Sequence, residues 1–314
     1  MLEILDPGML ATVQDAVGRR EWRRFGVPLG GAADAWSARL ANRLVGNADD
    51  TAVLEVVGSG SVAFDAPAIV AVAGGLAATI GGIPMSPDSA RRVPAGSQVR
   101  LGTAADTGLR GYVAVAGGLD VEPVLGSRST DLRTGFGGLD GRQLRAGDRV
   151  PIGPAGASAS VHRWSGTRDD GPLRILGGPQ GSRATMEALI GQTWRVAGAV
   201  DRTGIRLDGP PLAHGGEVPS QGLLPGAIQV PPGGSPILML ADCPVTGGYV
   251  VAACVIGADV GRAAQLRPGN PVSFLEVGHD EARAAWLRLE AELEAVEALE
   301  ATRDGDPGWA GSHA

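Results

Sequence analysis

Three stretches of the chain share one pattern, a glycine turn followed by a short alternating strand. They are residues 94–101 (PAGSQVRL), 145–152 (RAGDRVPI) and 267–274 (RPGNPVSF), and the motif VAVAGG also occurs twice, at 70–75 and 113–118. The spacings between these copies are irregular, which argues against a solenoid of regular repeats. The pattern predicts two related β-barrels or β-sandwiches, one in each half of the chain.

Length and composition fit that prediction. The chain has 314 residues, enough for one large or two ordinary domains, and its 50 glycines and 22 prolines suit many tight turns. A hydrophobic content of 44% is too high for a disordered chain. We expect a mainly β protein with short helices. The expected divisions are a β-rich domain at 1–165, a second β-barrel domain at 171–280, a helix at 281–302 and a disordered tail at 303–314.

Helical patterns are few. Asp34 is placed to cap a helix from Ala35 to Leu44, and a short helix is expected near 184–190. In the segment 281–302, apolar residues recur at helical spacing between glutamates. We interpret it as an amphipathic helix that docks on its own barrel or on a partner.

Charge and hydropathy exclude some classes of function. The net charge of −7 argues against a nucleic-acid surface, which needs a clustered basic face. No apolar run approaches the roughly 20 residues that span a bilayer, and the N-terminus lacks a signal-peptide pattern. We therefore expect a cytoplasmic protein that binds neither nucleic acid nor membrane.

Every basic residue apart from the histidines is arginine, and the chain contains no lysine. Without a lysine amine it cannot form a Schiff base, supply a P-loop lysine or carry covalently attached biotin or lipoate. We therefore expect no covalently bound cofactor on this chain.

Cysteine and histidine give little sign of a metal site or a histidine-based triad. Cys243 and Cys254 have no zinc-type spacing, and the four histidines fall in predicted loops or tails. No metal site is expected. Cys254 lies in an apolar run and is interpreted as a core residue. Cys243, beside a glycine-rich turn, is either another core residue or a nucleophile.

The stretch from 220 to 250 combines buried strands with polar groups that a core does not need. Its two apolar runs, GAIQV and PILMLA, predict strands joined by the turn PPGGS. Gln229 sits inside the first strand. Beyond the second strand, Thr246, Gly247, Gly248 and Tyr249 form either a hairpin turn or a place where backbone N–H groups approach a ligand.

Two further positions in the N-terminal half carry polar groups of interest. Arg128 lies near the start of a long loop, beginning at Gly126, that is rich in charges and hydroxyls, where it would bind a carboxylate or phosphate, or pair with Asp131. Glu55 lies within an apolar strand, where a carboxylate is costly unless it is paired or ligated.

Together these blocks resemble a known family. The blocks are residues 26–47 (GVPLGGAADAWSARLANRLVGN), 126–148 (GSRSTDLRTGFGGLDGRQLRAGD), 201–212 (DRTGIRLDGPPL) and 223–249, with the shorter GPQ at 178–180 and QLRPG at 265–269. They are similar to the second subunit of the biotin-dependent carboxyltransferase family, variously called allophanate hydrolase subunit 2, the C component of 5-oxoprolinase or KipA-like. The resemblance reaches nearly to Phe274. This chain departs from many relatives at Cys243-Pro244 and at Val250.

The resemblance implies a fold of two cyclophilin-like β-barrels. It also implies an obligate KipI-like partner, called allophanate hydrolase subunit 1 or the B component of 5-oxoprolinase, in a heterotetramer with a site near the interface. The expected activity is that of an amidohydrolase subunit in an ATP-dependent 5-oxoprolinase, which opens the small amide 5-oxo-L-proline to L-glutamate. ATP would be used by the full complex. The alternatives are transfer of a carboxyl group from carboxybiotin to urea and a non-catalytic KipA-like regulatory role.

The family's motifs also imply the site residues. Residues implied to be catalytic are Gln229, Thr246 and Tyr249. Residues implied to bind substrate are Gln14, Asp34, Arg39, Asn42, Arg128, Ser129, Asp131, Gln180, Gly247 and Gly248. Lactams and ureas are both planar amides, so glycine N–H groups and uncharged side chains would suit either substrate.

Overall fold

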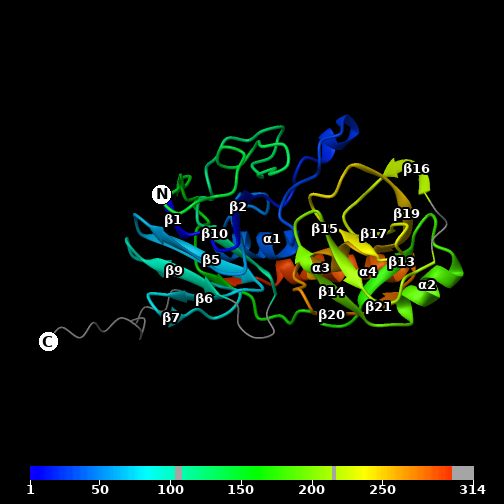
Figure 1. Ribbon diagram of the computed structural model, residues 1–314. Coiled ribbons are helices and arrows are strands. Elements are labelled where there is room, and N and C mark those ends of the chain that lie inside the picture. The colour runs from blue at the N-terminus through cyan, green and yellow to red at the C-terminus, as the bar shows by residue number, and fades with distance from the viewer. Residues whose placement is uncertain (103–107, 214–216, 299–314) are drawn as a thin grey trace.

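Short strands separated by tight turns make up most of the computed structural model, which describes residues 1–102, 108–213 and 217–298. The strands gather into an N-terminal and a C-terminal half that lie side by side (Figure 1). The chain is therefore mainly β, as predicted. The tail expected to be disordered, 303–314, lies outside the described residues.

The described strands of the N-terminal half form two sheets. The first sheet has the order β11 (Arg149–Val150), β1 (Leu2–Asp6), β4 (Gly60–Phe64), β9 (Gln98–Gly102), β6 (Ala77–Ile80) and β7 (Ile83–Pro84). The second has the order β2 (Leu10–Gln14), β3 (Val53–Val57), β10 (Arg110–Val115), β5 (Ala68–Gly74), β8 (Ser89–Val93), β12 (His162–Arg163) and β22 (Glu297–Ala298). Alternate apolar residues of both sheets, such as Leu2, Val62, Leu54 and Val113, share one buried core.

Helix α1 (Ala35–Leu44) packs against the second sheet with a buried apolar face that includes Leu40 and Leu44. Asp34 caps it as predicted, because its Oδ1 accepts a hydrogen bond from the backbone N–H of Ser37 at 3.1 Å. Just before it, the short 3₁₀ helix η1 (Arg20–Phe25) carries no buried residue and stands out from the body of the molecule (Figure 1).

The C-terminal half has a third sheet. Its order is β20 (Pro271–Val272), β14 (Trp194–Val200), β15 (Gly204–Asp208), β18 (Ile237–Met239), β17 (Ala227–Val230), β19 (Thr246–Val255), β13 (Leu173–Gly177) and β21 (Phe274–Glu276), and β16 (Glu217–Gly222) also pairs with β19. Helices α2 (Arg183–Ile190) and α3 (Gly257–Ala264) contribute to its core beside Trp194 and Ile228. The predicted strands around the PPGGS turn are β17 and β18, which pair antiparallel.

The glycine turns that suggested related halves have the expected geometry. Gly96, Gly147 and Gly269 have φ angles of +76°, +88° and +83°, and strands follow each of them. Among the described residues, however, the strand order of every sheet has two ends. The closed, cyclophilin-like form of the barrels therefore stays a prediction.

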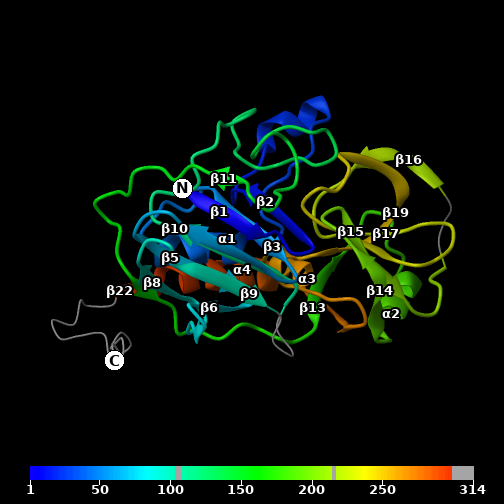
Figure 2. The same cartoon turned by 60° about the vertical axis from the view of Figure 1, so that its left-hand side comes forward.

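The C-terminal helix is shorter than predicted, and it packs on its own half, as expected, and also on the N-terminal half. Helix α4 (His279–Glu294) ends eight residues before 302, and β22 pairs with β12 of the N-terminal half. The helix also contacts α1, where Arg39 and Glu290 form a bidentate salt bridge. Arg39 Nη1 donates to Glu290 Oε1 at 2.6 Å, and Nη2 donates to Oε2 at 2.7 Å. The chain thus crosses back to its first half, as both views show (Figure 2). Sequence periodicity identified the helix but not its contact with the N-terminal half.

No helix within the described ranges is long and apolar enough to cross a membrane.

Candidate functional site

A buried network of charges joins the two halves. Glu55 on β3 accepts hydrogen bonds from Arg202 of the C-terminal half, from the Tyr112 hydroxyl at 2.9 Å and from the backbone N–H of Ala33 at 2.9 Å. Arg202 also holds Asp242 through two hydrogen bonds of 2.8 and 3.0 Å. Glu55 is therefore paired, as its position in an apolar strand required. Burial alone would raise the pKa of Glu55, but the charges of Arg202 and Arg110 hold it below its ordinary value.

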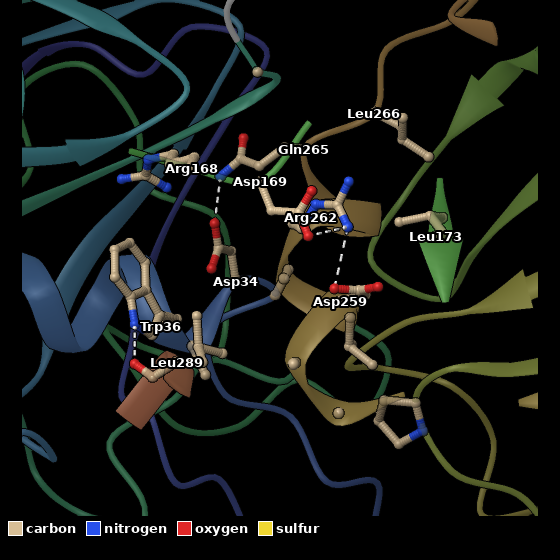
Figure 3. Close-up of a pocket in the computed structure, with 18 of the residues that line it drawn as sticks. Asp34, Trp36, Arg168, Asp169, Leu173, Asp259, Arg262, Gln265, Leu266 and Leu289 are labelled. Atoms are coloured by element: carbon tan, nitrogen blue, oxygen red, sulfur yellow. Dashed lines mark hydrogen bonds and ion pairs between the residues drawn. The ribbon is translucent and has the colours of Figure 1, made fainter. Parts of the chain in front are cut away.

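A cavity of about 990 Å³ lies between the halves beside this network. Figure 3 shows Asp34 and Trp36 on one side of it and Asp259 and Arg262 of helix α3 on the other, with Gln265, the residue after α3, beside Asp34. Gln265 Nε2 donates to Asp34 Oδ2 across the gap at 2.8 Å. The wall also includes Val17, Gly30, Pro225 and Ala241, so the cavity extends toward the loops described next.

The first group of predicted residues surrounds the loop 126–138. Gln14 Nε2 donates to the carbonyl oxygen of Thr130 at 3.3 Å, and the backbone N–H of Asp15 donates to Ser129 Oγ at 2.9 Å. Asp131 Oδ1 accepts hydrogen bonds from the backbone N–H groups of Arg133 and Thr134. Gln14, Ser129 and Asp131 are all buried here, so the loop is ordered by internal contacts. We call Gln14, Arg19, Ser129 and Asp131 the loop cluster.

Arg19 is the member of the loop cluster that the sequence did not single out. Its side chain is 1% exposed, its Nη2 donates to the Ser129 carbonyl oxygen at 2.6 Å, and its Nε donates to that of Val124 at 3.1 Å. The guanidinium lies 4.5 Å from the centre of the Phe136 ring. Burial lowers its pKa, while the nearby carboxylates of Asp131, Asp15 and Asp242 oppose that shift.

The second group lies at the start of β19. Thr246 to Tyr249 are its first four residues, so they form a strand end and not a hairpin turn. In the register of the described strands, they pair only with β16, which leaves their second edge without a strand partner. Gln229 lies beside Gly247, because a Cβ placed on Gly247 would be 2.8 Å from Gln229 Nε2. The glycines and Gln229 are therefore neighbours.

Two more glutamines border the same strand. Gln180 accepts a hydrogen bond from the backbone N–H of Val251 at 3.0 Å and exchanges two hydrogen bonds with Gln221, at 2.9 and 3.0 Å. Gln221 also donates to the carbonyl oxygen of Tyr249 at 3.4 Å. Together with the second group they form the strand cluster, whose members are Gln180, Gln221, Gln229 and Thr246 to Tyr249.

The loop cluster belongs to the N-terminal half and the strand cluster to the C-terminal half, and both lie at the same end of the cleft between the halves. Arg23 on η1 donates to the carbonyl oxygen of Leu223, whose side chain would touch a Cβ on Gly247. Asp242, just before β19, is close enough to Asp131 for that carboxylate to add to the rise in its pKa, which burial dominates. The blue and green loops of the N-terminal half accordingly meet the gold loop of the C-terminal half at the top of Figure 2.

Three predicted residues have other contacts. Arg39 pairs with Asp49 and Glu290, and the Asn42 side chain donates to the carbonyl oxygen of Thr51 at 2.7 Å. Arg128 Nε donates to the carbonyl oxygen of Val121 at 2.9 Å. These side chains hold α1 and the loop 126–138 in place. Of the predicted site residues, only Asp34 and Arg39 line the cavity wall.

Comparison with known proteins gives the family. The family model for the carboxyltransferase domain, subdomain A and B, matches residues 25–276. The chain belongs to the carboxyltransferase domain family. It is 38% identical to the C component of 5-oxoprolinase from Escherichia coli, over 91% of this chain and 94% of that protein.

Two solved structures are similar to this carboxyltransferase domain. The structure of TTHA0988 is 37% identical, with a TM-score of 0.80, and the match covers 87% of this chain and 55% of that one. The Kluyveromyces lactis urea carboxylase is 28% identical, with a TM-score of 0.86, over 93% of this chain and 29% of that one. The domain thus spans about half of the TTHA0988 chain and less than a third of the Kluyveromyces lactis chain.

Sequence reasoning missed Arg19, Gln221 and Arg202 of this carboxyltransferase domain. Gln221 stood inside the stretch already singled out, beside Gly222, and its place in a polar strand was a usable signal. Arg19 and Arg202 each lie next to another charged residue, so nothing in the sequence separates them from solvated arginines. Their burial depends on contacts with residues more than 100 positions away.

Cys243 has the properties of a core thiol. It is 1% exposed, and burial raises its pKa to about 11. Only about 0.1% of such a thiol is thiolate at pH 8, compared with roughly a quarter for an ordinary cysteine. We expect iodoacetamide to modify Cys243 at least about 100-fold more slowly in the folded protein than after denaturation, as measured by mass spectrometry of time points. Equal rates of modification in the folded and the denatured protein would show that the Cys243 thiol is reactive and would keep it as a candidate nucleophile.

Proposed function

We propose that this carboxyltransferase domain is one subunit of a two-subunit, ATP-dependent 5-oxoprolinase that opens 5-oxo-L-proline to L-glutamate. The observation that carries the proposal is the 38% identity to the C component of 5-oxoprolinase, which extends over nearly the full length of both chains. That relative is named as a subunit, which supports a partner for this chain as well. We expect the partner to be the KipI-like B component of 5-oxoprolinase, in a cytoplasmic heterotetramer.

The strand cluster supports an amide as substrate. Gln229 is 3% exposed and its Nε2 has no hydrogen-bond partner among the described residues, so this N–H group is free to donate to a carbonyl oxygen. Because successive N–H groups along a strand point to opposite edges, the unpaired edge of β19 adds one backbone N–H from the pair Gly247 and Gly248. Donors fixed before the reaction stabilise the negative charge that develops on a carbonyl oxygen when water attacks the carbonyl carbon.

The reaction is a hydrolysis. The oxygen of water bonds to the lactam carbonyl carbon, the ring C–N bond breaks, and the nitrogen leaves as the amino group of L-glutamate after taking up a proton. ATP is a co-substrate of the full complex in this proposal, and a second water hydrolyses it to ADP and phosphate. Gln229 and the glycine N–H group bind the carbonyl oxygen, while the loop cluster faces the remainder of the substrate.

The test is an assay of the two purified subunits together for ATP-dependent release of L-glutamate from 5-oxo-L-proline. We expect release from the pair and none from either subunit alone. A pair that binds tightly but releases no glutamate would contradict the proposal and favour a regulatory role.

Carboxyl transfer is the second candidate, because the family model is that of a carboxyltransferase and the Kluyveromyces lactis relative is a urea carboxylase. The chain has no lysine for biotin, so the carrier would be another chain. Transfer to urea should then stop when avidin is added, whereas glutamate release from 5-oxo-L-proline should not change.

A glycine substitution separates the role of Gln229 from general stability. A methyl group on Gly247 would lie 2.8 Å from Gln229 Nε2 and 2.7 Å from Leu223 Cδ1, so Gly247→Ala should displace the amide. We expect turnover of the complex, measured at a temperature where the variant is fully folded, to fall about tenfold, or roughly 1.4 kcal/mol of barrier.

Gly222→Ala is the matched control. Gly222 lies opposite Thr246 on β16, and its methyl group would meet nothing within 4 Å. We expect its turnover to stay within about twofold of the unchanged complex. If both variants lost activity equally, the contact with Gln229 would not be the cause.

A further inference from the structure

The loop cluster contains three buried polar atoms that have no hydrogen-bond partner within the described parts of the chain. They are Gln14 Oε1, Arg19 Nη1 and Asp131 Oδ2. Buried polar atoms are nearly always hydrogen-bonded, and a charged group without a partner is the most costly exception. Three such atoms around one loop suggest that a ligand supplies the missing bonds.

Each of the three side chains is fixed by its other atoms. Gln14 Nε2 donates to Thr12 Oγ1 at 3.0 Å and to the Thr130 carbonyl oxygen. Asp131 Oδ1 holds the turn at Arg133 and Thr134, so only Oδ2 is available. The three side chains are therefore held by hydrogen bonds that do not involve the free atoms.

Arg19 and Asp131 carry opposite charges, yet no ion pair joins them in the described structure. The Arg19 guanidinium is held by two carbonyl oxygens and the Phe136 ring, which leaves Nη1 as its free donor. The other nearby carboxylate, Asp15, is already satisfied. It accepts hydrogen bonds from the backbone N–H groups of Val17, Gly18 and Arg128 and from the Ser127 hydroxyl.

The free donor of Arg19 lies behind the wall of the interdomain cavity. A Cβ on Gly30 would be 3.3 Å from Arg19 Nη1, and Gly30 itself lines the cavity. Gly30 has a φ angle of +63°, a conformation that favours glycine. Because Gly30 has no side chain, the Arg19 guanidinium lies directly behind the backbone of the cavity wall at this position.

We propose that Arg19, Asp131 and Gln14 form a subsite for a carboxylate group attached beside an amide N–H. The carboxylate accepts a hydrogen bond from Arg19 Nη1, and the N–H donates to Asp131 Oδ2 or Gln14 Oε1. This inference deepens the proposed function and rests on it. It selects amides that carry a carboxylate next to the nitrogen, such as 5-oxo-L-proline and allophanate, over neutral urea. The sequence had pointed to Arg128 for a carboxylate, but Arg128 is only half-buried, whereas Arg19 is buried and its Nη1 lacks a partner among the described residues.

The test measures binding by calorimetry to the complex of this chain with its partner subunit. The four probes are 5-oxo-L-proline and allophanate, which carry both groups, and 2-pyrrolidone and urea, which lack the carboxylate. The variants are Arg19→Gln and Asp131→Asn, which replaces the free acceptor with an N–H donor. The control is Arg92→Gln, because Arg92 is an exposed arginine on β8.

We expect Arg19→Gln to weaken binding of the two carboxylate probes by about 10- to 100-fold, while 2-pyrrolidone and urea change by less than about twofold. Asp131→Asn, which keeps the Arg19 guanidinium, should weaken the same two probes and 2-pyrrolidone, which shares the ring N–H. Arg92→Gln should change nothing.

The inference and the proposed function fail in different ways. If allophanate binding depends on Arg19 but the unchanged complex does not process 5-oxo-L-proline, the subsite stands and the 5-oxoprolinase function is wrong. If the complex releases glutamate but Arg19→Gln and Asp131→Asn bind all four probes as the unchanged protein does, the subsite is wrong. Failure of both carboxylate probes to bind the unchanged complex would also overturn it.

Discussion

Replacing Arg202 with methionine should lower the free energy of unfolding by about 3–5 kcal/mol. Arg202 is 3% exposed and pairs with Glu55 of the other half and with Asp242. Methionine keeps much of the volume but leaves the Glu55 carboxylate, which is 1% exposed, without its main counter-charge. The measurement is urea denaturation of the purified chain.

Two further variants show whether the unpaired charge causes the loss. Arg195→Met changes an exposed arginine on the neighbouring strand β14 and should cost less than about 1 kcal/mol. Adding Glu55→Gln to Arg202→Met should recover part of the stability, because the buried charge is then removed. A loss below about 1 kcal/mol for Arg202→Met alone would mean that this network does not hold the halves together.

Replacing Gln229 with alanine should reduce turnover of the two-subunit complex at least about tenfold. Removing one fixed donor to a developing oxyanion costs about 2.7–4 kcal/mol of barrier in comparable sites, so the loss could reach 100-fold or more. Gln229 Nε2 has no partner to lose within the described structure, so the fold should be little affected. The measurement is the initial rate of glutamate release at saturating substrate.

Thr246→Val is expected to act in the same direction, because Thr246 is exposed at the open end of β19 beside the glycines. Circular dichroism and the melting temperature provide the control for folding of both variants. If both variants turn over substrate at the rate of the unchanged complex, the reaction does not take place at the strand cluster.

Local patterns in the sequence were enough to predict much of the fold. The mainly β class, helix α1 with its Asp34 cap and the β17–β18 pair all follow from spacing and turn chemistry over a few residues. The same reasoning required a partner for Glu55, because a lone carboxylate in an apolar strand is costly. It could not name Arg202, which lies 147 positions away.

What the sequence could not predict depends on contacts between distant segments. The amphipathic pattern of α4 does not show that the helix packs on both halves, through Ala285 and Leu289 on its own half and through the Arg39–Glu290 pair on α1. Likewise, Arg128 and Arg19 are equally plausible anion-binding residues in the sequence. The difference between them is burial, because Arg19 is fully buried with one guanidinium nitrogen that has no partner among the described residues, whereas Arg128 is only half-buried.

A crystal structure of the complex with bound 5-oxo-L-proline tests the central claim most directly, namely that both halves of this chain contribute to one amide site. We predict electron density for the ligand between the clusters, with its carbonyl oxygen within hydrogen-bonding distance of Gln229 Nε2 and its carboxylate at Arg19. Density for the ligand only at another surface of the complex, with both of these side chains unchanged and without contacts to it, would contradict the account.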